Sequence, residues 1–89
     1  MRCVKLFTLP GCPKCPAAKH LAGKLAEKHG IEVEVFDLST PIGLAEASSY
    51  QVMSTPTFLV VEDPDGADEV VQEWPGSVPT ADEVTALLP

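Results

Sequence analysis

Apolar and polar positions along the first third of the chain predict a strand followed by a helix. Residues 4–9 (Val-Lys-Leu-Phe-Thr-Leu) are rich in β-forming side chains and end at Pro10 and Gly11, which predicts a strand. The next apolar positions recur at intervals of three and four residues, the period of an amphipathic helix. These positions are Ala18, Leu21, Ala22 and Leu25. We expect this helix to begin at Pro13 and to stop at Gly30, because proline suits the first helical position and glycine the residue after the last.

The middle of the chain predicts a second strand and a second helix. Residues 31–36 (Ile-Glu-Val-Glu-Val-Phe) begin with a strict apolar–acidic alternation, which is typical of a strand at a sheet edge with one solvated face. The sequence Ser39-Thr40-Pro41, with a capping hydroxyl and a proline, indicates the start of a helix. We expect that helix to end near Tyr50.

The last third of the chain predicts a hairpin and a short helix. Residues 57–61 are a continuous apolar run, which suits a central strand buried on both faces. A turn at residues 64–66 (Pro-Asp-Gly) and a returning strand at residues 69–74 complete the hairpin. Thr80 opens the capping box Thr-Ala-Asp-Glu, and the helix that it begins is expected to continue through Leu88.

The order of these segments, βαβαββα, predicts an α/β fold. The first βαβ unit requires parallel strands with a right-handed crossover, and the final two strands are antiparallel. The 89 residues include 45% hydrophobic side chains, a composition typical of globular chains. We expect residues 1–89 to form a single domain.

Charge and cysteine usage restrict the functional class. Thirteen acidic and six basic side chains give a net charge of −7, which argues against nucleic acids or anionic membranes as partners. No segment approaches the ~18 consecutive apolar residues of a membrane span, and Lys5 interrupts the apolar run that a signal peptide would need. We therefore expect a cytoplasmic protein. Three cysteines do not make a disulfide framework, so a close pair indicates redox chemistry or metal binding.

Cys12 and Cys15 lie where the first strand gives way to the first helix. Unpaired backbone N–H groups and the helix dipole favour a thiolate at Cys12, and the thiolate is the form that attacks a disulfide. Cys15, three residues on, is close enough to attack a mixed disulfide at Cys12 and release the substrate. Pro13 stiffens the turn and Lys14 adds a positive charge. A C-x-x-C pair that opens a βαβ unit predicts a redox motif.

A second motif, Thr55-Pro56-Thr57, stands at the start of the buried strand. With both motifs, the chain resembles small members of the thioredoxin/glutaredoxin superfamily over essentially its whole length. The resemblance implies a thioredoxin fold with a four-stranded mixed sheet, order 2-1-3-4, flanked by three helices. It also implies that Cys12 is the nucleophile and Cys15 the resolving thiol.

The resemblance further implies how substrates bind. Pro56 is expected to follow a cis peptide bond and to face the cysteines, and the backbone of Thr55 to pair with an extended substrate segment. Pro13 and Lys14 complete the expected substrate-binding residues. The implied activity is that of a thiol–disulfide oxidoreductase acting on proteins that contain disulfides. It needs no cofactor beyond the cysteine pair, and we expect a monomer.

The expected electron donor depends on which branch of the superfamily the chain resembles. Thioredoxins carry a tryptophan before the cysteine motif and a buried acid near the position of Leu6, and this chain has neither. Residues 76–80 lack the acidic pair with which glutaredoxins bind glutathione. Residues 74–79 (Trp-Pro-Gly-Ser-Val-Pro) are similar to a segment of the glutaredoxin-like electron donors of ribonucleotide reductase, and the chain also resembles compact thioredoxins. We therefore expect a donor of the thioredoxin-reductase type.

Three alternatives stay open from the sequence. The chain can be a glutathione-dependent glutaredoxin, a metal or iron–sulfur binder that shares a cluster between subunits, or a non-catalytic module that uses the fold to hold a partner. Cys3 is expected to be a buried small hydrophobe at the far end of the sheet. His20 and His29 are expected to be solvated. Trp74 fits the hairpin core or the active face equally well, and Met53 fits an exposed partner contact or simple packing.

Overall fold

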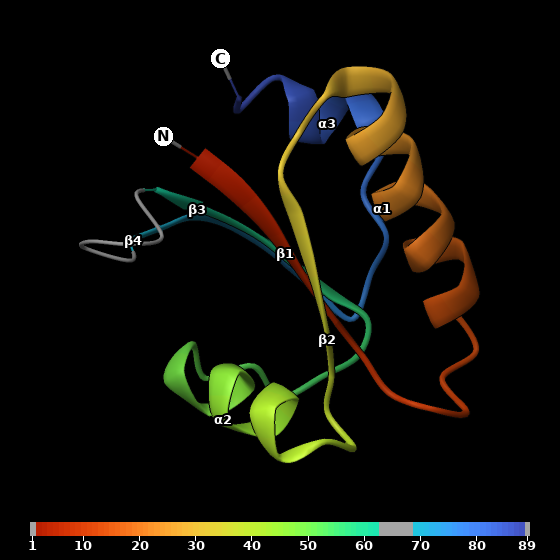
Figure 1. Ribbon diagram of the computed structural model, residues 1–89, viewed down its shortest axis with the longest axis vertical. Coiled ribbons are helices and arrows are strands. Elements are labelled where there is room, and N and C mark those ends of the chain that lie inside the picture. Colours follow the sequence, from red (N-terminus) through yellow and green to blue (C-terminus); the bar gives the residue numbers. More distant parts are fainter. Residues whose placement is uncertain (1, 63–68, 89) are drawn as a thin grey trace.

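The computed structural model describes residues 2–62 and 69–88. The described chain folds in the order predicted from the sequence (Figure 1). Its seven elements are β1 (Arg2–Thr8), α1 (Cys15–His29), β2 (Val33–Asp37), α2 (Pro41–Ser49), β3 (Thr57–Glu62), β4 (Glu69–Pro75) and α3 (Ala81–Thr85). The turn predicted at residues 64–66 lies outside the described residues. None of the described helices has the length and apolar character needed to cross a bilayer.

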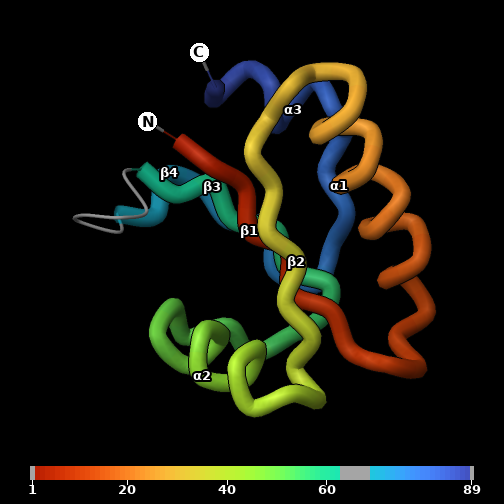
Figure 2. Tube along the Cα trace, viewed as in Figure 1, coloured from red at the N-terminus to blue at the C-terminus, as the bar shows by residue number. Residues whose placement is uncertain are grey.

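The four strands form one mixed sheet in the order β2-β1-β3-β4. β1 is parallel to β2 and antiparallel to β3, and β3 is antiparallel to β4. α1 and α3 cover one face of the sheet and α2 covers the other (Figure 1, Figure 2). The predicted thioredoxin fold, with sheet order 2-1-3-4 and three flanking helices, is confirmed.

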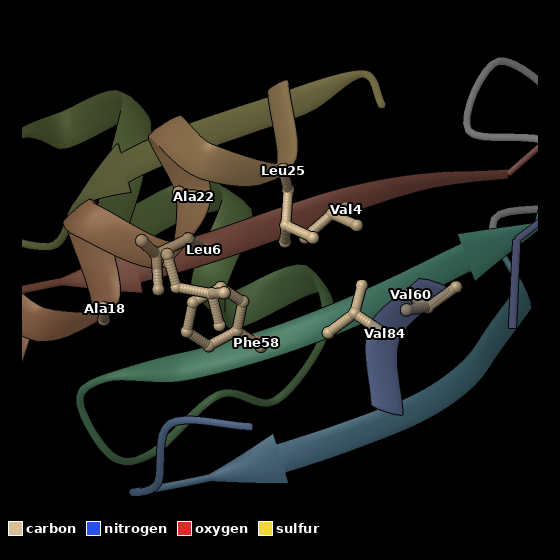
Figure 3. Close-up of a cluster of buried hydrophobic side chains, with 9 residues drawn as sticks. Val4, Leu6, Ala18, Ala22, Leu25, Phe58, Val60 and Val84 are labelled. Atoms are coloured by element: carbon tan, nitrogen blue, oxygen red, sulfur yellow. The ribbon is translucent and has the colours of Figure 1, made fainter. Parts of the chain in front are cut away.

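Both faces of the two central strands are buried, and alternate residues contribute to two separate cores. On the α1 face, the cluster drawn in Figure 3 joins sheet residues to both helices. Its members are Val4, Leu6, Phe58 and Val60 from the sheet, Ala18, Leu21, Ala22 and Leu25 from α1, and Val84 from α3. On the α2 face, the second cluster consists of Cys3, Phe7, Leu59, Val61 and Ala47. The prediction that Cys3 is a buried small side chain is confirmed, since it is 1% exposed.

The start of α1 differs from the prediction. The helix begins at Cys15, with Lys14 as its N-cap, and not at Pro13. Pro16 has no N–H to donate to the carbonyl of Cys12, so a helix that started at Pro13 would lose its first hydrogen bond. The N–H of Cys15 donates to the Cys12 carbonyl instead, at 3.3 Å, and closes a tight turn. The cysteine loop is therefore a turn that precedes the helix.

The boundary between α1 and β2 also differs from the prediction. Gly30 ends α1 as predicted, at φ +64°, a conformation that glycine adopts without strain. The N–H of Ile31 donates to the carbonyl of Leu25 at 3.2 Å, so Ile31 still belongs to the turn that ends the helix. β2 consequently begins at Val33 and not at Ile31. β2 lies at a sheet edge, as its alternating pattern predicts.

α3 is shorter than predicted. The capping box at Thr80 is present, with its hydroxyl accepting from the N–H of Glu83. The helix ends at Thr85 rather than Leu88 because the last N–H groups donate three residues back, as in a 3₁₀ turn. Leu87 still packs against the core on the α1 side, so the apolar stripe predicted for this segment is used.

A buried lysine connects three elements on the α2 side of the sheet. The Nζ of Lys5, on β1, donates to Glu46 of α2 at 2.6 Å and lies 3.3 Å from the carboxylate of Glu34 on β2. The rings of Phe36 and Tyr50 lie 5.3 and 5.4 Å from the same nitrogen. Burial by itself lowers the pKa of Lys5, but the Glu46 hydrogen bond and the attraction of Glu34 together raise its pKa above the ordinary value. The ammonium group therefore stays charged at neutral pH.

Removing the charge of Glu46 should destabilise the fold. We expect Glu46→Gln to lower the free energy of unfolding by about 1–2 kcal/mol at pH 7, because a hydrogen bond to a buried charge contributes more than a neutral one and Glu46 is partly exposed. Glu34→Gln is the matched control, with a smaller loss, since its carboxylate is farther from Lys5 and more exposed. Urea unfolding of the two variants measures both. Equal losses would contradict the assignment of Glu46 as the main partner.

Candidate active site

A disulfide links Cys12 and Cys15, and the Cα atoms of the two residues are 5.3 Å apart. Cys12 lies in the loop after β1 and is half-buried, whereas Cys15 is the first residue of α1 and is 4% exposed. Cys12 is thus the more exposed residue of the pair, and Cys15 is shielded by the protein. The expected roles call for this order of exposure, since the attacking thiol must reach a partner and the resolving thiol must reach only Cys12.

The second motif lies at the start of β3. The peptide bond between Thr55 and Pro56 is cis, as the family resemblance implies. Pro56 is fully buried and Thr55 is half-buried. The hydroxyl of Thr57 donates to the carbonyl of Ser54 at 2.7 Å, which closes the turn that carries the cis bond. Thr55 therefore lies in a hydrogen-bonded turn that leads directly into β3.

The register of the sheet brings the two motifs to the same end of the molecule. Phe7, near the end of β1, pairs with Thr57 at the start of β3, and Thr57 pairs with Pro75 at the end of β4. The cysteine loop leaves β1 from this end, and the cis-proline turn enters β3 there (Figure 1). Antiparallel pairing of the central strands thus places segments about forty residues apart in sequence at one edge of the sheet.

A third segment, the loop after β4, joins the site. The Nζ of Lys14 donates to the carbonyl of Gly76 at 3.4 Å. Gly76 has φ +67°, and a Cβ built on it would lie 3.8 Å from the hydroxyl oxygen of Ser54. Gly76 therefore lies between the cysteine loop and the cis-proline turn. The sequence signal for it was the segment 74–79, but the positions of Gly76 and Ser54 in the site were not predicted.

The remaining sequence candidates are Met53, the two histidines and Trp74. Met53, two residues before Thr55, is 94% exposed, so it fits the alternative of an exposed partner contact and not that of packing. His20 and His29 are solvated, as predicted. Trp74 is half-buried against the core on the α1 face, and its indole N–H donates to Glu83 of α3 at 3.3 Å. These contacts support the interpretation of Trp74 as hairpin core.

Among the described residues, no group of side chains supports the metal-binding alternative. Within residues 2–62 and 69–88, no three side chains of His, Cys, Asp and Glu gather closely enough to hold a metal ion. Cys3 belongs to the core on the α2 face and lies near the start of β1, whereas the cysteine loop follows the end of that strand.

Comparison with known proteins gives a consistent family. A family model described as "Thioredoxin domain" matches residues 2–89. Over 57 residues, or 64% of this chain, the sequence is 36% identical to "Probable Thioredoxin" of Archaeoglobus fulgidus and 35% identical to "Thioredoxin" of Methanocaldococcus jannaschii. These alignments span 63% and 67% of the two relatives, so the match covers less than two thirds of the first.

The fold has close structural relatives as well. The structure of thioredoxin 1 from Thermosipho africanus TCF52B superposes with a TM-score of 0.74 over 94% of this chain and 88% of that one. The two sequences are 14% identical, so this likeness concerns the fold alone.

The unequal exposure of the cysteines predicts an order of reactivity. When the protein is reduced and treated with a limiting amount of iodoacetamide near neutral pH, Cys12 should be alkylated first, because Cys15 and Cys3 are 4% and 1% exposed. Peptide mass mapping over time measures the order. Earlier labelling of Cys15 or Cys3 would contradict the assignment of the accessible thiol.

Proposed function

Since the chain belongs to the thioredoxin domain family, we propose that it is a thiol–disulfide oxidoreductase that reduces disulfides in other proteins. The observation that carries this proposal is the Cys12–Cys15 disulfide, in which Cys12 is half-buried and Cys15 is buried. The cis-proline turn at the same sheet edge and the thioredoxin relatives support it.

The proposed reaction transfers two electrons from the dithiol to the substrate. The Cys12 thiolate attacks one sulfur of the substrate disulfide, a Cys12–substrate disulfide forms, and the other substrate sulfur leaves as a thiolate that takes a proton from water. The Cys15 thiolate then attacks the sulfur of Cys12. This step forms the Cys12–Cys15 disulfide seen in the structure and releases the second substrate thiolate.

We propose that the substrate binds as an extended segment alongside the cis-proline turn. The backbone of Thr55 hydrogen-bonds to the segment, in the manner of an added strand, so many sequences are accepted. Pro13, Lys14 and Pro56 frame the accessible sulfur, and Lys14 is held toward this face by its contact with Gly76. The exposed side chain of Met53 adds a soft apolar contact.

We propose that this protein acts as a cytoplasmic monomer and that another protein supplies its electrons. Glutathione is a small anion, and the net charge of −7 offers it no general attraction. Residues 76–80 lack the acidic pair of glutaredoxins. A flavoprotein reductase needs only an accessible disulfide and an extended backbone to dock against, and Cys12 and Thr55 supply these. No cofactor beyond the cysteine pair takes part.

Removing the resolving thiol tests the reaction. Cys15→Ser should accumulate a covalent adduct with one insulin chain through Cys12, because no second thiol remains to release it. Mass spectrometry under non-reducing conditions measures the adduct, and dithiothreitol should dissolve it. Cys12→Ser should form little adduct, and Cys3→Ala should reduce insulin at nearly the wild-type rate. A Cys15→Ser protein that forms no adduct would favour the non-catalytic module.

The electron donor is tested by a pair of initial rates on one oxidised sample. Thioredoxin reductase with NADPH should reduce the Cys12–Cys15 disulfide much faster than glutathione with glutathione reductase and NADPH. NADPH consumption at 340 nm with insulin as the final acceptor follows both reactions. Faster turnover with glutathione at a physiological concentration would contradict the proposed donor and favour the glutaredoxin alternative.

A further inference from the structure

An apolar groove lies between α1 and the edge strand β2, away from the cysteine loop. Its volume is about 350 Å³. It is lined by Lys19, Ala22, Gly23, Ala26, Val33 and Val35. Val35 stands in the middle of β2 and is 51% exposed, although the apolar alternation of this strand would place it in a core. The groove is thus a strip of apolar surface that the described chain leaves uncovered.

Gly23 is a glycine that packing within the chain does not explain. It lies in the interior of α1, where glycine is less favourable than alanine by about 1 kcal/mol. A Cβ built on Gly23 meets no atom within 4 Å, and its backbone has an ordinary helical conformation. The missing side chain instead opens the wall of the groove. Glycine at such a position permits close approach by another backbone.

The outer edge of β2 has hydrogen-bonding groups to offer. Among the described residues, β2 pairs only with β1. The Val4 N–H donates to the Glu32 carbonyl and the Leu38 N–H to the Thr8 carbonyl, so the even-numbered residues on this segment bond toward β1. Because the backbone alternates, Val33 and Val35 direct their N–H and C=O groups outward. In Figure 1, this edge runs between α1 and α2.

The charged side chains at the groove favour an acidic partner. Lys19 is the charged residue of the lining, and within the described chain it makes no ion pair shorter than 4 Å. The pKa of Asp37 is lowered mainly by hydrogen bonds from Ser39, and Lys19 adds only a minor attraction. The outer surface of the same helix adds the exposed side chains of Lys24 and Lys28, against a single acid, Glu27. The chain as a whole carries a net charge of −7, but the surface beside the apolar groove is basic.

We propose that this groove binds an extended segment of a partner protein, which adds as a strand to the edge of β2. Apolar side chains of the segment cover Val33 and Val35 and enter the space above Gly23, and an acidic side chain pairs with Lys19. The side chains on the other face of the segment are uncharged. Glu34 lies on that side of β2, and its carboxylate is already paired with Lys5. Strand addition supplies affinity through main-chain bonds, and the groove supplies selectivity.

A second copy of the chain fits the groove less well. Two β2 edges paired about a twofold axis would bring the Lys19 side chains of both copies to one interface, without an acid in the lining of the groove to neutralise them. The two lysines would repel each other, and the interface would leave both charges unpaired. The basic rim therefore favours an acidic partner.

A cysteine-free peptide tests the proposal independently of the disulfide chemistry. The probe is acetyl-Glu-Thr-Val-Thr-Val-Thr-Glu-amide, which places glutamate and valine on one face and threonine on the other in either strand direction. Titration into ¹⁵N-labelled protein should produce saturable shifts of amides in residues 19–26 and 33–37. The same peptide with lysine for glutamate should bind about two- to tenfold more weakly, although the overall charge of the protein favours it.

Variants separate the groove from general charge effects. Gly23→Leu fills the groove and should weaken binding by more than about tenfold, with an unchanged spectrum elsewhere because its Cβ has open space. Lys19→Glu should reverse the preference between the two peptides. Lys28→Glu, the same charge change on the same helix but outside the groove lining, should preserve it.

Several results would overturn the proposal. They are no saturable shift at millimolar peptide, shifts confined to the surroundings of Cys12 and Pro56, a preference for the lysine peptide, or full binding by Gly23→Leu. Concentration-dependent shifts of β2 without peptide, abolished by Gly23→Leu, would assign the groove to a second copy of the chain instead.

Discussion

The antiparallel pairing of β1 with β3 is the constraint on which the rest of the structure depends. Both strands are buried on both faces, so each of their apolar side chains belongs to one of two cores. A slip of one residue would exchange the two sets, and Lys5 would move to the purely apolar face. The register is therefore strongly specified. Because that register aligns Phe7 with Thr57, it also sets the cysteine loop and the cis-proline turn at one edge.

α2 itself adds little apolar surface to the core on its side of the sheet. α2 contributes Ala47 to the core there, while Ile42 and Leu44 are exposed. The ion pair from Lys5 to Glu46 fixes the helix against β1. Gly43 lets the start of α2 approach the backbone of β2 so closely that a Cβ there would overlap the carbonyl oxygen of Asp37. A weakly amphipathic helix is thereby given one defined position.

α1 contributes to the proposed active site and to the proposed groove with different parts of its surface. Its N-terminal end holds Cys15 and, through Lys14, contacts the loop after β4. Its buried stripe packs on the sheet, and the flank beside β2 lines the groove with Ala22, Gly23 and Ala26. The lysines of this helix oppose the acidic character of the chain as a whole.

The sequence alone determined the order of elements, the central position of residues 57–61, the edge position of β2 and the cysteine pair. These follow from local physics: the period of apolar residues, capping hydroxyls, and the conformations of proline and glycine. The start of α1 was wrong by two residues, because the effect of Pro16 on the hydrogen bond to Cys12 outweighed the preference of Pro13 for the first helical position.

Only the tertiary structure decided the contacts between distant segments. Lys14 and Gly76 are 62 residues apart, and Lys5 and Glu46 are 41 apart. A lysine in a strand looks the same from sequence whether it is solvated or buried against two carboxylates. The groove at β2 likewise depends on how α1 lies over the sheet edge. Such contacts arise from the order and register of the strands, and a local pattern carries no information about which distant side chain will face it.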